Sequence, residues 1–260
     1  MTAASAGSAR SAGSAGSAGS AELETRLAHL RDHLGAVRAR ISRGCAQAGR
    51  DPADITLVVV TKYFPASDVL LLHSLGVRHF GENRDQEAGE KFREVRRALS
   101  DAGEPDLTLH FIGQLQSNKA AHVAGYADVV ESVDRGRLVS ALSKGAHTAD
   151  RRLQVLLQVS LDGATTRGGV LPEDAQGLAD AVAAQGLLDL RGVMAVAPLG
   201  ADPDDAFARL HEVADGIRAR YPQADWISAG MSGDLEAGLR HGATHLRVGT
   251  AILGSRPSLL

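Results

Sequence analysis

The 260-residue chain has little of several residue types, and each shortage excludes a class of protein. Its single cysteine, Cys45, cannot form an internal disulfide or a cysteine-rich metal site. Aromatic residues make up 3% of the chain, and 28 Lys and Arg against 31 Asp and Glu leave a net charge of -3. A nucleic-acid-binding protein would carry a basic stripe and stacking aromatics, so we expect no nucleic-acid partner.

Long apolar runs are also absent. No uncharged stretch approaches the roughly 18 apolar residues that a transmembrane helix needs, so we expect no membrane partner. The N-terminal segment MTAASAGSARSAGSAGSAGS lacks the basic start and apolar run of a secretory signal, which indicates a cytoplasmic protein. Because this Ser/Ala/Gly-rich segment, residues 1–20, has nothing to bury, we expect a disordered tail.

From residue 21 onward, helical and strand patterns alternate. Residues 21–49 carry apolar side chains at helical spacing and predict an extra helix in front of the first strand. Short, mostly apolar runs predict strands at 55–63, 78–83, 108–113, 128–134, 152–161, 187–197, 226–231 and 245–253. Helical patterns lie between them at 65–76, 84–99, 117–127, 135–149, 173–185, 202–220 and 233–241.

A sustained alternation of strand and helix predicts parallel strands joined by crossover helices. Eight such units favour an α/β fold, a closed (β/α)8 TIM barrel that forms a single domain over residues 21–260. An open, doubly wound sheet is the alternative. It would call for a glycine-rich turn after the first strand, where this chain has FPAS.

Lys62 ends the first predicted strand, and function in such barrels lies where strands end. Side chains alternate along a strand, so we expect Lys62 to share the inward face with Val60 and Val58. A desolvated lysine amine is a nucleophile that condenses with aldehydes. The alternative is a lysine that reaches solvent or pairs with a carboxylate.

The last two units carry small and hydroxyl-bearing residues. Ser232 follows the seventh predicted strand, and Gly249 and Thr250 lie within the eighth. Small residues let backbone N–H groups approach an anion, and barrels often bind phosphate at the loops after strands seven and eight. A helix cap at Ser232 and simple packing at Gly249 are the alternatives.

Arg247 shares a face of the eighth strand with Gly249, so we expect its guanidinium inside the barrel. It must meet an acceptor there because it does not lose its proton. Facing a pyridine nitrogen, it would oppose protonation of the ring and make that ring a weak electron sink. A buried ion pair with Asp234 or Glu131 is the alternative.

Six segments together resemble a known family: VVVTKYFPASDV, FGENRDQEAGEK, LHFIGQLQSNK, ESVD, LRGVMAVAP and SAGMSGDLEAGLRHGATHLRVGTAILGSR. They are similar, in order and spacing from about residue 23 to residue 256, to the pyridoxal 5'-phosphate homeostasis proteins of the YggS/PROSC type. These are single-domain relatives of the barrel domain of alanine racemase. The resemblance implies a fold-type III barrel that holds pyridoxal 5'-phosphate (PLP) as an aldimine on Lys62.

The resemblance also implies roles for other residues. Asn83 would lie near the cofactor and Met194 would line the surroundings of its ring, while Arg247 would face the pyridine nitrogen. The phosphate would be held by Ser232, Gly233, Gly249 and Thr250. The family's mouth-lining segment would contain His110, Gln114, Ser117 and Asn118. The chain departs from the family at Tyr63, where many members have a small residue, and at residues 161–170, where Arg167 stands in place of a lysine.

Other candidate sites are weaker. The ten histidines include no HExxH pattern, so we expect no metal site and ordinary surface or packed histidines. We interpret Cys45 as a small core residue. The charged helix at 84–99 is most simply the solvated outer face of a barrel.

We therefore expect a PLP carrier or buffer with little turnover. Racemisation needs an acid and a base on opposite faces of the substrate carbon. Alanine racemase takes its second base, a tyrosine, from a separate C-terminal domain of the neighbouring subunit, and this chain ends at Leu260, after the eighth strand. None of the three tyrosines, Tyr63, Tyr126 and Tyr221, is obviously placed to substitute.

The alternatives are a weak PLP-dependent amino-acid racemase and a Schiff-base aldolase acting on a phosphorylated substrate. PLP-dependent apoenzymes are the candidate recipients of the cofactor, and a bare barrel is compatible with a monomer.

Overall fold

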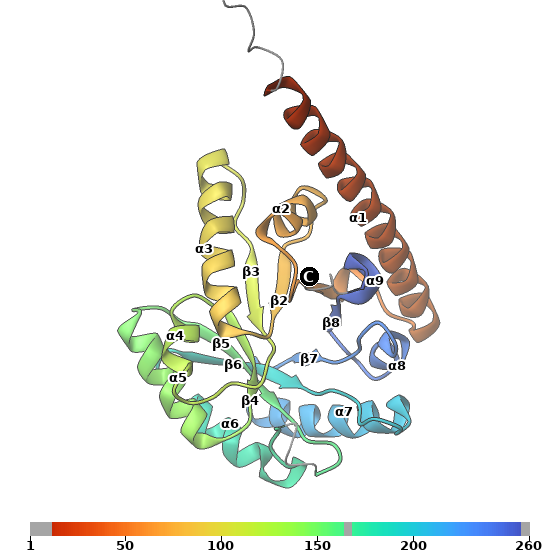
Figure 1. Ribbon diagram of the computed structural model, residues 1–260. Coiled ribbons are helices and arrows are strands. Elements are labelled where there is room, and N and C mark those ends of the chain that lie inside the picture. Colours follow the sequence, from red (N-terminus) through yellow and green to blue (C-terminus); the bar gives the residue numbers. More distant parts are fainter. Residues whose placement is uncertain (1–11, 164–167, 256–260) are drawn as a thin grey trace, which may run out of the picture.

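The computed structural model describes residues 12–163 and 168–255, which form a closed barrel of parallel strands in sequence order, β1 to β8 (Figure 1). The strands are β1 Thr56–Val60, β2 His79–Glu82, β3 Thr108–Phe111, β4 Val129–Val133, β5 Leu153–Gln158, β6 Leu188–Met194, β7 Trp226–Ser228 and β8 His245–Val248. Closure is made by β1 and β8, where Val58 is the register partner of Arg247. The predicted (β/α)8 barrel is confirmed.

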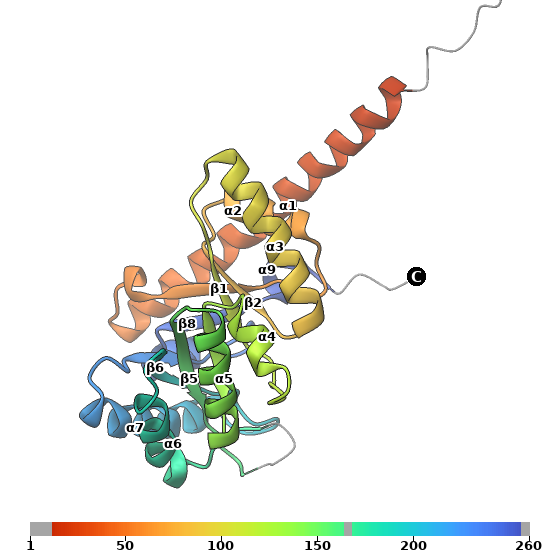
Figure 2. The ribbon, with the colours of Figure 1, turned by 90° about the vertical axis from the view of Figure 1, so that its left-hand side faces the viewer.

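Helices surround the strands (Figures 1 and 2). They are α1 Ala12–Ala48, α2 Ala66–Ser74, α3 Asp85–Ala102, α4 Ala120–Ala124, α5 Gly136–Thr148, α6 Ala175–Ala183, α7 Pro203–Arg220, α8 Leu235–Arg240 and α9 Thr250–Leu253. Two 3-10 helices, η1 Pro52–Asp54 and η3 Pro172–Asp174, precede β1 and α6. Among the residues described, no helix combines the length and the apolar character needed to cross a membrane.

The extra N-terminal helix is longer than the pattern predicts. The structure describes residues 12–20 as the first turns of α1, where we expected part of a disordered tail over residues 1–20, and residues 1–11 lie outside the described residues. Alanine is the best helix former, and extending an existing helix is far easier than nucleating one. The packed part of α1 therefore supplies the nucleus from which these turns continue.

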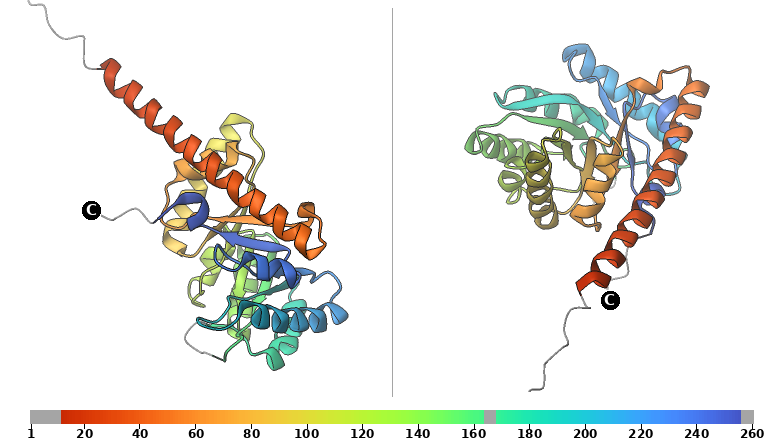
Figure 3. Two further views of the ribbon diagram at one scale, coloured as in Figure 1. Left: turned by 90° about the vertical axis from the view of Figure 1, so that its right-hand side faces the viewer. Right: turned by 90° about the horizontal axis from the view of Figure 1, so that it is seen from above.

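The packed part of α1 lies against α2, α8 and α9, and its first turns project beyond the barrel (Figure 3). Its buried face consists of Leu30, Leu34, Val37, Ile41 and Cys45, spaced three or four residues apart as one helix face requires. Cys45 is fully buried, which confirms that it is a small core residue.

Several predicted strands end earlier than expected. Residues 245–253 divide into β8 and α9, because the carbonyl of Gly249 accepts hydrogen bonds from the N–H groups of Ile252 at 2.9 Å and Leu253 at 3.0 Å. β6 and β7 end before Ala195 and Ala229, which are nevertheless fully buried. Buried loop residues are as apolar as strand residues, so hydrophobicity does not mark where a strand stops.

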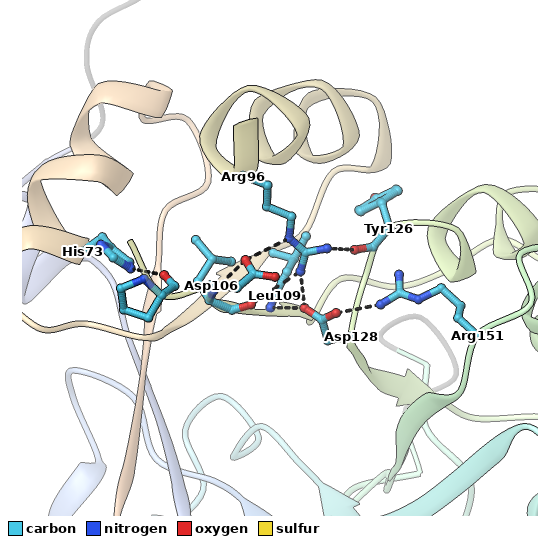
Figure 4. A network of polar contacts seen from close by, with 9 residues as sticks. His73, Arg96, Asp106, Leu109, Tyr126, Asp128 and Arg151 are labelled. Atoms are coloured by element: carbon cyan, nitrogen blue, oxygen red, sulfur yellow. Dashed lines mark hydrogen bonds and ion pairs between the residues drawn. The ribbon is translucent and has the colours of Figure 1, made fainter. Parts of the chain in front are cut away.

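A polar network around Asp128, which precedes β4, connects the N-terminal ends of the strands (Figure 4). Its carboxylate accepts hydrogen bonds from Arg96 Nη2 at 2.5 Å, Arg151 Nη2 at 2.7 Å and the N–H of Leu109 at 2.7 Å. These groups belong to α3, to the segment before β5, and to β3. One carboxylate therefore sets the starts of neighbouring strands, at the end of the barrel that serves stability in this fold.

Candidate functional site

A cavity of about 380 Å³ opens at the C-terminal ends of β1 and β8, within the size range of small-molecule sites. Its wall brings together residues that are far apart in the sequence. They are Val60, Lys62, Tyr63, Phe64, Ile112, Met231, Ser232, Gly233, Arg247, Gly249, Thr250 and Gly254. Six of the eight residues that we expected to bind the cofactor are in this set: Lys62, Ser232, Gly233, Arg247, Gly249 and Thr250.

Lys62 lies in a tight turn rather than at the end of a strand. β1 ends at Val60, and the N–H of Phe64 donates to the carbonyl of Thr61 at 3.0 Å. Tyr63 has a φ of 71°, a left-handed conformation that costs a non-glycine residue about 1–3 kcal/mol. Our prediction of a strand through Lys62 is therefore wrong, because this turn interrupts the alternation, although Lys62 and Val60 still line one cavity.

The turn that contains Lys62 is held in place by the ion pair between Glu82 and Lys91. Glu82, at the end of β2, is fully buried and accepts hydrogen bonds from Lys91 Nζ and Thr61 Oγ1, each at 2.7 Å. Lys91 Nζ also donates to the backbone carbonyl of Thr61 at 3.0 Å. Burial raises the pKa of Glu82, and the charge and hydrogen bond of Lys91 oppose that rise. Both backbone and side chain of the residue before Lys62 are thus fixed.

Gly233 and Gly249 also line the cavity, and they differ in their surroundings. A Cβ added at Gly233 would meet nothing within 4 Å, so its backbone is open to the cavity. A Cβ at Gly249 would lie 3.1 Å from the carbonyl oxygen of Val60. Packing against β1 is therefore part of the reason for Gly249, as the alternative interpretation held. Ser232 and Thr250 add hydroxyl groups beside the two glycines.

Helix α1 braces both walls of the cavity through two arginines. Arg40 holds Glu236 at the start of α8 in a bidentate pair, with both distances 2.5 Å, and donates to the carbonyl of Ser232 at 2.6 Å. Arg26 pairs with Asp68 of α2 at 2.6 Å and also donates to the carbonyl of Leu253 at 3.3 Å. The extra helix thereby positions the Ser232 loop and α9.

Arg247 is buried inside the barrel and forms the floor of the cavity. Its Nη1 donates to Ser228 Oγ at 2.5 Å and its Nη2 donates to the carbonyl of Ala195 at 2.9 Å. Nη1 also lies 3.7 Å from a carboxylate oxygen of Glu131, so of the two ion-pair partners that we considered, the structure selects Glu131. Asp234 instead accepts the N–H of Met231 at 2.6 Å.

Asn83 and Met194 do not line the cavity. Asn83 follows β2 at the same end of the barrel, and its buried Oδ1 has no hydrogen-bond partner among the described residues. That oxygen is available to a bound group. Met194 lies inside the barrel, where it packs with Val129, Leu156 and Trp226.

The segment that we expected to line the mouth contributes differently. His110 is fully buried in the barrel interior rather than at the mouth, because it belongs to β3 and faces Glu131. Gln114 and Asn118 are exposed, and Ser117 accepts a long hydrogen bond of 3.4 Å from Arg135. The segment's contribution to the cavity wall is Ile112.

Sequence reasoning missed other parts of the wall. Tyr63 lines the cavity, with its ring centroid 6.0 Å from Lys62 Nζ, whereas the sequence marked it only as a departure from the family pattern. Phe64, Met231 and Gly254 were also missed, and their only signal was their position in the loops after strands one, seven and eight. Arg167 lies outside the described residues.

Comparisons with known proteins place this geometry in context. The family model "Alanine racemase, N-terminal domain" matches residues 33–257. The pyridoxal phosphate homeostasis protein of Mycobacterium tuberculosis is 42% identical over 246 residues, which cover 90% of this chain and 94% of that protein.

Solved structures agree. PipY of Synechococcus elongatus with PLP bound has a TM-score of 0.73 and 30% sequence identity, and the match covers 86% of this chain and 100% of that chain. Alanine racemase of Corynebacterium glutamicum has a TM-score of 0.63 at 15% identity, covering 90% of this chain and 62% of that one. The likeness to the racemase is one of fold.

Proposed function

Because this chain belongs to the pyridoxal phosphate homeostasis family, we propose that it binds PLP in the cavity between β1 and β8 and serves as a PLP carrier or buffer. Lys62 is the residue that attaches the cofactor covalently. Ser232, Gly233, Gly249 and Thr250 hold its phosphate, and Arg247 faces its ring nitrogen.

The observation that carries this proposal is the single cavity that Lys62 shares with the Ser232–Gly233 and Gly249–Thr250 turns. An amine together with hydroxyl and N–H donors in one cavity suits a molecule with an aldehyde and a phosphate. The open backbone at Gly233 is a feature that a bound cofactor would use.

When bound, PLP supplies an aldehyde that condenses with amines and a ring that withdraws electrons from the attached carbon. The residues of this chain limit the second property. Arg247 stays protonated and can only donate hydrogen bonds, so it disfavours a proton on the ring nitrogen. An unprotonated ring stabilises a carbanion weakly, which favours storage of the cofactor over turnover.

The proposed role extends to partners and location. PLP-dependent apoenzymes are the recipients of the cofactor, the protein acts in the cytoplasm, and it works as a monomer.

Weak racemisation of amino acids is the second candidate, and one observation favours it. Tyr63 lines the cavity beside Lys62 and is the kind of residue that could act as a second base. Arg84 lies 4.8 Å from the ring centroid of Tyr63. Tyr63 directly follows Lys62 in the chain, which argues against the two side chains reaching opposite faces of one substrate carbon.

The test is a visible absorption spectrum of the purified protein reconstituted with PLP, before and after borohydride. A band near ~420 nm that borohydride removes, with the modified peptide mapped to Lys62, is expected. Lys62→Ala should lose the band and keep the fold, whereas Lys144→Ala, which alters an exposed lysine of α5, serves as the control and should keep the band. An adduct on another lysine would contradict the assignment.

The same protein incubated with L-alanine in deuterated buffer separates the two candidate functions. The carrier predicts no appreciable exchange of the α-proton. Rapid exchange that Tyr63→Phe abolishes would establish the racemase instead.

A further inference from the structure

The interior of the barrel contains a polar chain where layers of apolar side chains are usual. Glu131, His110 and Ser228 are fully buried, and Arg247 is nearly so. Burying an ion pair costs several kcal/mol of desolvation, and apolar residues of similar size are often equally stabilising. The neighbouring interior positions Val129, Leu156 and Met194 are apolar. Stability alone therefore does not account for the polar residues.

The contacts run in one line from the cavity floor to the far end of the barrel. Arg247 Nη1 donates to Ser228 Oγ at 2.5 Å, and Ser228 Oγ donates to Glu131 Oε2 at 2.7 Å. The other carboxylate oxygen, Glu131 Oε1, lies 2.7 Å from His110 Nδ1. His110 Nε2 lies 3.0 Å from His79 Nδ1.

Glu131 accepts hydrogen bonds at both of its carboxylate oxygens. A carboxylate only accepts, so Ser228 Oγ–H and His110 Nδ1–H are the donors to it. Both donors therefore point toward Glu131. Burial raises the pKa of Glu131, but the hydrogen bond from His110 and the charges around it prevail and bring it to about 2.

Among the described groups around Arg247, Glu131 is the carboxylate within ion-pair distance, at 3.7 Å. Burial, reinforced by His110, lowers the pKa of His79 to about 4 and that of His245 to about 3, so both are neutral near pH 7. Lys62 lies on the cavity wall, and Asp234 is held by the backbone of Met231. Glu131 thus balances the charge of the guanidinium at the cavity floor.

We infer that Glu131 and Ser228 are positioning residues for the cofactor site. Glu131 cancels the charge that Arg247 brings to the cavity, and Ser228 fixes the orientation in which Arg247 meets the ring. This inference rests on the proposed function, since it describes how the chain sets the electrostatic environment of bound PLP. His110 holds Glu131 in place from the other side.

The test follows the pH midpoint of the visible absorbance of the reconstituted protein. Glu131→Gln leaves the charge of Arg247 unbalanced, which disfavours the protonated form of the nitrogen that links Lys62 to the cofactor. The midpoint should fall by on the order of one pH unit. The double variant Glu131→Gln/Arg247→Gln removes both charges and should return the midpoint to within a few tenths of a unit of the parent.

Ser228→Ala tests the orientation of Arg247 separately, because it keeps the charges of both Arg247 and Glu131. It should leave the midpoint nearly unchanged and speed the release of PLP roughly tenfold, as expected from losing a hydrogen bond to a charged group. It also keeps the inference testable if Glu131→Gln does not fold, as judged by circular dichroism. Asp128→Asn, which alters a carboxylate at the far end of the barrel, is the matched control and should change neither quantity.

The outcomes separate the two proposals. If the parent protein forms no borohydride-sensitive link at Lys62, the proposed function fails. If the parent forms it and Glu131→Gln keeps the parent midpoint, or the double variant keeps the shift of the single one, the charge balance is refuted. Unchanged PLP release from Ser228→Ala would refute the positioning role of Ser228.

Discussion

Gly233 and Gly249 face the same cavity, but only Gly249 is in close contact with the rest of the protein. A Cβ at Gly249 would lie 3.1 Å from the carbonyl oxygen of Val60, whereas a Cβ at Gly233 would meet nothing within 4 Å. The two glycines therefore separate packing from binding. Gly249 lets β8 turn into α9 beside β1, and Gly233 leaves a backbone surface open to a ligand.

The first prediction uses this difference. Gly233→Ala should leave the free energy of unfolding within about 0.5 kcal/mol of the parent, because the new methyl group occupies open space. It should weaken PLP binding roughly tenfold or more, because the methyl group stands where the phosphate approaches. Gly249→Ala should instead destabilise the fold by about 1–3 kcal/mol through overpacking.

Urea unfolding of the apoprotein and an absorbance titration with PLP measure the two effects. Full PLP affinity in Gly233→Ala would place the phosphate elsewhere. Thr250→Val, which removes a hydroxyl while preserving shape, should also weaken binding, by about 1–3 kcal/mol for a lost bond to a charged group.

The second prediction concerns the ion pair beneath the turn of Lys62. Lys91→Met leaves the carboxylate of Glu82 buried without its cation, which should cost about 3–5 kcal/mol of stability. The Thr61 backbone would lose a hydrogen-bond donor, so covalent attachment of PLP at Lys62 should also slow.

The double variant Glu82→Gln/Lys91→Met is the internal control, because it removes both charges and should recover much of the stability. Equal losses in the single and double variants would show that Lys91 and Glu82 do not act as a pair. Stopped-flow absorbance measures the attachment rate, and urea unfolding measures the stability.

A third prediction separates the two ends of the barrel. Asp128→Ala removes the acceptor shared by Arg96, Arg151 and the N–H of Leu109, and should destabilise the protein by about 2–4 kcal/mol. The affinity of the folded protein for PLP should stay within about twofold, because the cavity lies at the opposite end of the strands. A large loss of affinity at a temperature where the variant is fully folded would count against this separation.

The fourth prediction is a pH dependence of stability. Burial lowers the pKa of His245 from 6.5 to about 3 in the folded protein. Below pH 6.5 the unfolded chain therefore binds a proton that the folded chain does not, and stability falls as the pH falls. Between pH 7 and pH 5 this one residue should reduce the free energy of unfolding by about 2 kcal/mol.

His245→Gln should reduce the dependence in that interval by about this amount and leave the similar contribution of His79, whose pKa is lowered to about 4. Urea unfolding at several pH values can measure the difference. Glu131 contributes to the pH dependence of stability at lower pH. Its pKa of about 2 lies below the usual value of 4.5, so its stabilising effect is present above pH 4.5 and is lost as the pH falls toward 2. An unchanged slope between pH 7 and pH 5 in His245→Gln would show that other histidines dominate.

Local patterns in the sequence were enough to predict the barrel architecture. Runs such as ITLVVV and the helical spacing of Leu30, Leu34 and Val37 follow from the periods of strands and helices, and repeated alternation leads to a parallel barrel. The ordered motifs also led to Lys62, Ser232, Gly233, Arg247, Gly249 and Thr250, which the structure brings to one cavity. Each carries its chemistry in its own identity and in its place after a strand.

The tertiary structure decided where those residues lie and which polar groups they contact. The turn that lifts Lys62 off β1, the pairing of Arg247 with Glu131 rather than Asp234, and the burial of His110 inside the barrel all depend on contacts between residues far apart in the sequence. A chain's periodicity reports which face of an element is buried, but it contains no information about which polar group lies opposite. Strand register and barrel closure make that choice.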